Sequence, residues 1–136
     1  MREVYISSTL RAQVVERAQE RCEYCGLHSV LYYLPFHIDH AIPLKQGGPT
    51  SLENLAFACP MCNQYKGSTI ATYLTSEFNE LIPLYNPRWE PWSNHFVLQS
   101  DGIIKPLTAI GQGITRILLL NDENRVIERY EQGLLP

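Results

Sequence analysis

The chain has 136 residues, a formal net charge of −3 and 45% hydrophobic residues. This length and apolar content indicate one folded domain and exclude an intrinsically disordered chain. No apolar run approaches the length of a membrane span, and the stretch MREVYISSTLRAQ lacks the apolar core of a secretory signal. We therefore expect a cytoplasmic protein with no membrane partner. The weakly negative charge disfavours any partner held mainly by a basic surface.

The first third of the chain predicts a helix, a tight knuckle and a strand. Residues 9–20 place apolar side chains at helical spacing, with Ser7 or Ser8 as the N-cap. Residues 22–26 predict a knuckle whose final glycine supplies the tight turn. β-branched and aromatic residues over 30–40 indicate a strand, which the proline in its middle confines to one side.

The middle of the chain predicts a loop, a second strand and a second helix. Residues 45–50, KQGGPT, have the composition of a loop. Residues 54–58, NLAFA, are mostly apolar and predict a short strand that leads into a second knuckle. We expect a helix over 60–74 because Pro60 suits the first helical position, although Gly67 weakens this prediction.

The C-terminal part predicts an irregular segment, a hairpin and two helices. Residues 83–93 contain three prolines and two tryptophans, and we expect them to pack irregularly over the core. Residues 96–106 predict a hairpin that turns at 100–102, and residues 109–120 and 123–132 predict helices. The expected ends of these helices are Thr108 and Asp122 as N-caps and Gly133 as a C-terminal stop.

The cysteines occur in two C-x2-C pairs, Cys22 with Cys25 and Cys59 with Cys62. In a chain without a secretory signal, two such pairs indicate a metal site rather than a disulfide framework. The alternative interpretation is a redox protein with two reactive pairs, or free cysteines in the core.

Two sets of ligands compete for this metal. The first joins the Cys22 pair to His37 and His40, as in a two-cysteine, two-histidine finger, and the second consists of all four cysteines. The histidines of such fingers lie on a helix with at least three residues between them, whereas only two residues separate His37 from His40. We therefore favour four thiolates, which form a closed, structural zinc site and leave Asp39 and His40 free for other chemistry.

The remaining polar residues follow a recognisable order around the knuckles. After the first C-x2-C come Asp39-His40, a Gly-Gly pair and Asn54-Leu55, and after the second come Asn63 and Lys66. This order and its local spacing resemble the HNH endonuclease family, in its zinc-stabilised four-cysteine variety. The resemblance covers about residues 20–67, roughly a third of the chain.

The resemblance implies an α+β fold in which two antiparallel strands and a helix form a ββα-metal core around one divalent ion. In this pattern His40 is the general base and Asp39 and Asn63 are ligands of a catalytic Mg²⁺ or Mn²⁺. Asn54 matches the central asparagine, which braces the loop between the strands. The residues that match the ligands of the structural Zn²⁺ are Cys22, Cys25, Cys59 and Cys62.

The chemistry of phosphodiester hydrolysis agrees with these residue types. A hard divalent cation prefers oxygen ligands, and a histidine is the side chain best suited to act as a base near neutral pH. Because Asp39 and His40 are adjacent, they would face opposite ways in a regular strand. Both can reach one phosphate only if the strand bends or ends there. Pro43 is consistent with such a bend or end.

The sequence therefore predicts a metal-dependent endonuclease whose partner is nucleic acid, with DNA as the expected form. Candidate contacts to the substrate are His37, Lys66 and Arg88. We expect residues 1–82 to form the nuclease core and residues 83–136 an extension packed on it, with the N-terminal helix, the hairpin and the last helices around the core. A homodimer or two successive visits would be needed to cut both strands.

The alternative function is a zinc-stabilised module on the same fold that binds nucleic acid or protein without cutting. The lack of a basic stripe favours this alternative, whereas the presence of Asp39, His40 and Asn63 disfavours it.

Overall fold

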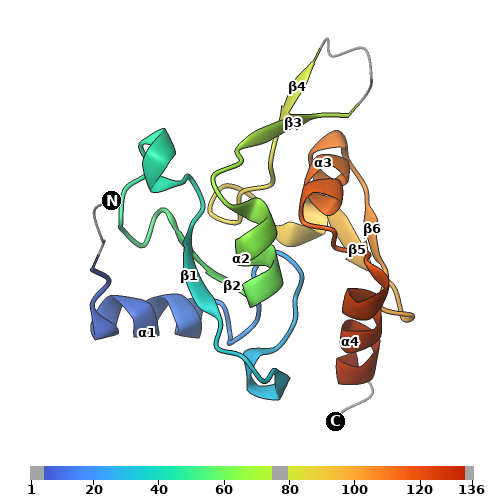
Figure 1. The fold of residues 1–136 in the computed structure, drawn as a ribbon, viewed down its shortest axis with the longest axis horizontal. Helices are drawn as coiled ribbons and strands as arrows, with labels where there is room; N and C mark the ends of the chain where they lie inside the picture. Colours follow the sequence, from blue (N-terminus) through green and yellow to red (C-terminus); the bar gives the residue numbers. More distant parts are fainter. Residues whose placement is uncertain (1–4, 75–79, 134–136) are drawn as a thin grey trace.

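The computed structural model describes residues 5–74 and 80–133, which form an α+β fold (Figure 1). Within these residues the helices are α1 (Ser8–Arg17), α2 (Pro60–Lys66), α3 (Ala109–Ile117) and α4 (Glu123–Gly133). The strands are β1 (His37–His40), β2 (Leu55–Ala58), β3 (Ala71–Tyr73), β4 (Leu81–Pro83), β5 (Phe96–Leu98) and β6 (Ile104–Pro106). They pair as three antiparallel hairpins, β1–β2, β3–β4 and β5–β6. The expected fold class is confirmed, and no described helix is long and apolar enough to cross a membrane.

A β1–β2–α2 unit lies at the centre of the molecule. The two strands pair from His37 opposite Ala58 to His40 opposite Leu55, and α2 follows β2 directly and packs against β1 (Figure 1). Every residue of β2 is buried, as expected for a strand covered on both faces. Regular pairing of β1 stops at His40, so the chain leaves the strand where the sequence places its Asp-His pair.

The loop between β1 and β2 is closed by a single buried amide. The Asn54 side chain accepts a hydrogen bond from the Ile42 backbone N–H at 2.9 Å and donates to the carbonyls of Ile42 and Pro49, both at 2.9 Å. Gly48 lies so close to these hydrogen-bonded groups that an added Cβ would lie 1.7 Å from the Ile42 carbonyl oxygen. Only glycine fits at that position.

The segment after β4 packs aromatic side chains on the first knuckle, as the sequence predicts. The Tyr85 ring meets the Tyr24 ring edge-on at 6.5 Å and the Phe96 ring at 5.3 Å between centroids. The Trp92 indole stacks on Phe96 and donates a hydrogen bond to the Tyr24 carbonyl at 2.9 Å. These contacts join the C-terminal part of the chain to the core around the cysteines.

The N-terminal helix is shorter than predicted, whereas the strand within 30–40 lies on one side of its proline, as predicted. Helix α1 begins after its N-cap Ser7 but ends at Arg17, because Gln19 and Glu20 adopt positive φ angles of 55° and 60° that cannot continue a helix. The strand predicted over 30–40 is regular only over β1, on the C-terminal side of Pro35, and the residues before it form a short 3₁₀ turn and irregular chain.

The prediction of one helix over 60–74 was wrong beyond Lys66. Helix α2 stops there because Gly67 takes a φ of +50°, and the chain then forms the β3–β4 hairpin, which the sequence reading missed. The hairpin predicted over 96–106 is confirmed as β5–β6, with Gly102 at φ +91° in its turn. Helices α3 and α4 lie where two helices were expected.

We predict that Gly48→Ala lowers the free energy of unfolding by about 3 kcal/mol, at the upper end of the usual cost of overpacking. The new methyl group would collide with the Ile42 carbonyl, and that oxygen cannot yield without breaking its hydrogen bond to Asn54. Urea unfolding followed by circular dichroism measures the change. Gly133→Ala is the matched control, since its added Cβ meets no atom within 4 Å among the described residues. Equal unfolding midpoints for the two variants would contradict this account of the loop.

Candidate active site and metal centre

Four cysteine sulfurs converge from the two knuckles. Cys22 and Cys25 follow α1, Cys59 is the N-cap of α2 and Cys62 lies in its first turn. All four Sγ atoms lie within 4.8 Å of one another, and those of Cys25 and Cys59 are 3.7 Å apart. A tetrahedral ion with zinc–sulfur bonds of about 2.3 Å places its ligands about 3.8 Å apart, so this donor set fits Zn²⁺.

Burial adds an electrostatic reason for a cation among these sulfurs. Each cysteine is at most 3% exposed, and burial raises the pKa of the Cys22 and Cys62 thiols well above its ordinary value. Four neighbouring thiolates can therefore coexist here only with a compensating positive charge. Neither His37 nor His40 belongs to the cluster, so the structure favours four cysteines over the finger-type set.

Asp39 lies on the buried side of β1, held between a tyrosine and a lysine. Its Oδ2 accepts a hydrogen bond from the Tyr24 hydroxyl at 2.6 Å, and Tyr24 itself stands between the two cysteines of the first knuckle. The Lys66 ammonium at the end of α2 lies 3.1 Å from Oδ2 and 3.4 Å from Oδ1. Lys66 also donates to the His40 carbonyl at 3.0 Å, so it joins α2 to the end of β1.

Two described neighbours, Tyr24 and Lys66, hold the Asp39 carboxylate in place. The pKa of Tyr24 is well above its ordinary value, first because of burial and second because of the Asp39 charge, so the hydroxyl remains a donor. A carboxylate offers about four lone-pair positions, and the Tyr24 hydroxyl and Lys66 ammonium occupy at most three of them. At least one lone-pair position of the Asp39 carboxylate therefore has no partner among the described residues.

His40 is half-buried at the end of β1 and is oriented by the loop. Its Nε2 lies 2.9 Å from the Thr50 hydroxyl oxygen. Burial is the main cause that lowers the pKa of His40, Lys66 lowers it further, and Asp39 opposes them. The neutral imidazole is thereby favoured near neutral pH, and in the tautomer that donates from Nε2 to Thr50 the lone pair on Nδ1 can accept a proton.

Asn63 lies in α2, the helix that packs against β1. It precedes Lys66 by three residues, a spacing that places two helical side chains on the same face, and Lys66 contacts Asp39. The Asn63 side chain makes no hydrogen bond to any residue that the structure describes. Its amide oxygen therefore has no hydrogen-bond donor among the described residues.

The remaining predicted site residues occupy different surroundings. His37 is exposed at the start of β1. Arg88 does not join the Asp39–His40 group; its guanidinium forms an ion pair with Glu23 and donates to the Leu55 carbonyl at 3.3 Å. Because Glu23 also accepts from the Phe57 backbone N–H at 2.8 Å, Arg88 ties the first knuckle to β2.

The sequence reading missed three residues of these two centres. Tyr24 stands inside the first C-x2-C and Thr50 directly follows Gly-Gly-Pro, so both lie beside motifs that were noted. Arg125 of α4 contacts the sulfurs of Cys59 and Cys62 from a distant part of the chain. Nothing local in the sequence signals that contact.

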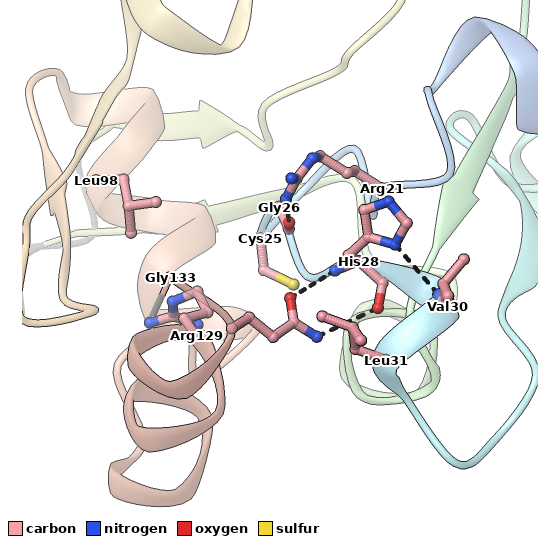
Figure 2. A pocket seen from close by; sticks show the side chains of 10 residues that line it. Arg21, Cys25, Gly26, His28, Val30, Leu31, Leu98, Arg129 and Gly133 are labelled. Carbon is pink, nitrogen blue, oxygen red and sulfur yellow. Dashed lines mark hydrogen bonds between the residues drawn. The ribbon is translucent and has the colours of Figure 1, made fainter. Parts of the chain in front are cut away.

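A cavity of about 590 Å³ lies between the first knuckle and α4, and Figure 2 shows its lining, with Arg21, Cys25 and Arg129 among the residues around it. Neither Asp39 nor His40 lines this cavity. It therefore belongs to the junction of the knuckle with α4 and not to the Asp39–His40 group.

Comparison with known proteins finds a match to the part of the chain that contains the β1–β2–α2 unit. The family model described as HNH endonuclease matches residues 22–69, which include both knuckles, β1, β2 and α2. Over 60 residues the chain is 40% identical to the CRISPR-associated endonuclease Cas9 of Corynebacterium diphtheriae. This alignment covers 43% of the chain but only 5% of that protein. Residues 22–69 are therefore similar to the HNH endonuclease family, and the chain spans only a small part of the Cas9 protein that it matches.

Proposed function

We propose that the protein is a metal-dependent endonuclease that hydrolyses phosphodiester bonds in nucleic acid, with DNA as the substrate. One observation carries this proposal. Asp39 and His40 meet α2 where β1 ends, and both lie inside the segment that matches the HNH family. The buried carboxylate and the neutral imidazole supply the two functions that hydrolysis requires of the protein: an oxygen donor for a cation and a base for water.

Two metal ions have separate roles in this proposal. The four cysteines would hold a structural Zn²⁺, since a site closed by four thiolates leaves no position for substrate. Asp39 and Asn63 would hold Mg²⁺ or Mn²⁺. When bound, that ion stabilises the negative charge that develops on the phosphate during hydrolysis.

Residues of the chain would accept the proton of the attacking water and hold the reacting side chains in position. His40 would take a proton from water at Nδ1 while the water oxygen forms its bond to phosphorus. The bond from phosphorus to the leaving oxygen breaks, and that oxygen leaves with the bonding electron pair and takes a proton from solvent water. Thr50 keeps the imidazole turned so that Nδ1 is the free nitrogen. Tyr24 acts as a positioning residue, because its hydroxyl holds the Asp39 carboxylate through Oδ2. Asn54 fixes the loop that carries Thr50.

Contacts to the substrate are proposed for His37 and Lys66. His37 is exposed on the strand that ends at His40, and a phosphate beside Asp39 would also lie close to the Lys66 ammonium. Arg88 could reach a phosphate only by giving up its ion pair with Glu23. Cleavage of both strands would require a homodimer, or one protein that binds and cuts the nucleic acid twice in succession.

The alternative is a zinc-stabilised binding module that does not cut, and one contact favours it. The buried Lys66 ammonium already neutralises Asp39, which weakens the attraction of that carboxylate for a second cation. The count of bound metal ions separates the two functions.

We predict that His40→Ala reduces the rate of plasmid nicking in Mg²⁺ or Mn²⁺ by about 10²- to 10⁴-fold, the usual contribution of a general base. The variant removes the only proton acceptor assigned to the reaction and leaves the proposed metal ligands intact. His28→Ala is the control, since the side chain of His28 makes a single described hydrogen bond, to the Val30 N–H. Equal nicking by wild type and His40→Ala would remove His40 from the mechanism.

We predict that the zinc-loaded protein, after dialysis against Mn²⁺, contains one Zn²⁺ and one Mn²⁺ per chain. Elemental mass spectrometry measures both metals. Asp39→Asn should lose the Mn²⁺ and keep the Zn²⁺, because the substitution removes the negative charge but retains an acceptor for Tyr24. Asp101→Asn, in the exposed turn of β5–β6, is the matched control and should retain both ions. Zinc alone in the wild type would support the binding module, and freely reactive thiols in the zinc-loaded protein would support a redox role.

A further inference from the structure

Helix α4 reaches the metal centre through one buried arginine. Arg125 is 6% exposed, and its Nη2 lies 2.9 Å from the Cys62 sulfur and 3.6 Å from the Cys59 sulfur. This residue lies far outside the segment that matches the HNH family. The contact therefore comes from the C-terminal part of the chain and is not supplied by the knuckles themselves.

The negative charge of the proposed zinc site gives a physical reason for a guanidinium beside the cysteine sulfurs. Four thiolates around Zn²⁺ carry a net charge of about −2, and a buried charge is costly unless another charge or hydrogen bonds offset it. In the part of the chain that the structure describes, the backbone donors to these sulfurs are the N–H groups of Cys25, at 3.5 Å from the Cys22 sulfur, and Cys62, at 3.4 Å from the Cys59 sulfur. Within the described segments, Arg125 is the one charged side chain that donates to a cysteine sulfur.

Other contacts fix the direction of the guanidinium. The Nη1 of Arg125 donates to the carbonyl of Leu118, which caps α3, and lies 3.4 Å from the Leu119 oxygen. Arg125 therefore donates hydrogen bonds both to a carbonyl group at the end of α3 and to the cysteine sulfurs.

The far end of α4 contacts the chain two residues after the first knuckle. Gln132 lies two helical turns after Arg125, a spacing that returns to the same face of the helix. Its side chain accepts from the His28 backbone N–H at 2.8 Å and donates to the His28 carbonyl at 3.2 Å (Figure 2). One face of α4 thus contacts the second knuckle and the chain just after the first knuckle.

We propose that α4 is part of the metal centre, in which Arg125 offsets the charge of the zinc-bound thiolates so that zinc binding and docking of α4 strengthen each other. The coupling must be reciprocal, because it is a free energy shared by two equilibria. This inference rests on the proposed zinc site and is independent of whether the protein cuts nucleic acid.

The chain offers a matched control on the same helix. Arg129 lies one turn after Arg125 and is similarly buried, at 7% exposure. It donates to the backbone carbonyls of Gly102 at 2.8 Å and Leu120 at 2.6 Å, and it donates to no cysteine sulfur. Replacing either arginine by methionine removes a buried charge from α4, but only one of the two changes removes a donor to sulfur.

The test compares zinc transfer from the full-length protein to a chelating dye for Arg125→Met and Arg129→Met. We expect Arg125→Met to weaken zinc affinity about 10-fold or more, as is usual when a partner of a metal ligand is removed, and Arg129→Met to remain within about twofold of wild type. Hydrogen exchange should show that zinc removal loosens α4 in the wild type. Equal losses of affinity in the two variants, or a wild type that binds no zinc, would overturn the proposal.

A spectroscopic readout distinguishes charge compensation from packing. With Co²⁺ in place of zinc, the sulfur-to-metal charge-transfer band should shift in Arg125→Met and stay unchanged in Arg129→Met, because only Arg125 hydrogen-bonds to the sulfurs. Arg125→Lys keeps the charge and the helix, and should recover part of the lost zinc affinity even if the methionine variant folds poorly. An unshifted band in Arg125→Met and no recovery in Arg125→Lys would show that Arg125 only fills space.

Discussion

The convergence of four buried sulfurs within 4.8 Å is the constraint on which the rest of the structure depends. The two knuckles that supply these sulfurs enclose the whole of the β1–β2 hairpin, so a metal ion there would tie both ends of the hairpin to one point. The long intervening segment contains few regular elements, and closing it would otherwise cost considerable chain entropy. The free energy of zinc binding is large enough to offset such a cost.

Both sides of the candidate active site are attached to this centre. The first knuckle carries Tyr24, whose hydroxyl fixes Asp39, and the second begins α2, which carries Asn63 and Lys66. Asn54 fixes the loop between the strands, where Thr50 contacts His40. The proposed structural metal thus lies one side chain away from the proposed catalytic carboxylate, which links the integrity of the zinc site to the geometry of the reaction.

The sequence predicted what depends on local pattern and missed what depends on distant contacts. The knuckles, the hairpin at 96–106 and the N-caps Ser7 and Thr108 follow from residue types at fixed spacing. The β3–β4 hairpin was missed because the predicted helix was extended past Gly67, whose φ of +50° ends α2. The buried pair of Lys66 with Asp39, and Arg125 at the sulfurs, join residues far apart in the chain. No local pattern encodes such pairs.

The affinity of the zinc-loaded Tyr24→Phe variant for Mn²⁺, measured by titration calorimetry without nucleic acid, tests the central claim most directly. The substitution keeps the buried ring and removes only the hydroxyl that orients Asp39. The account predicts about 10-fold weaker Mn²⁺ binding, with one zinc per chain retained. Wild-type affinity for Mn²⁺ in this variant would contradict the claim that the first knuckle positions the catalytic carboxylate.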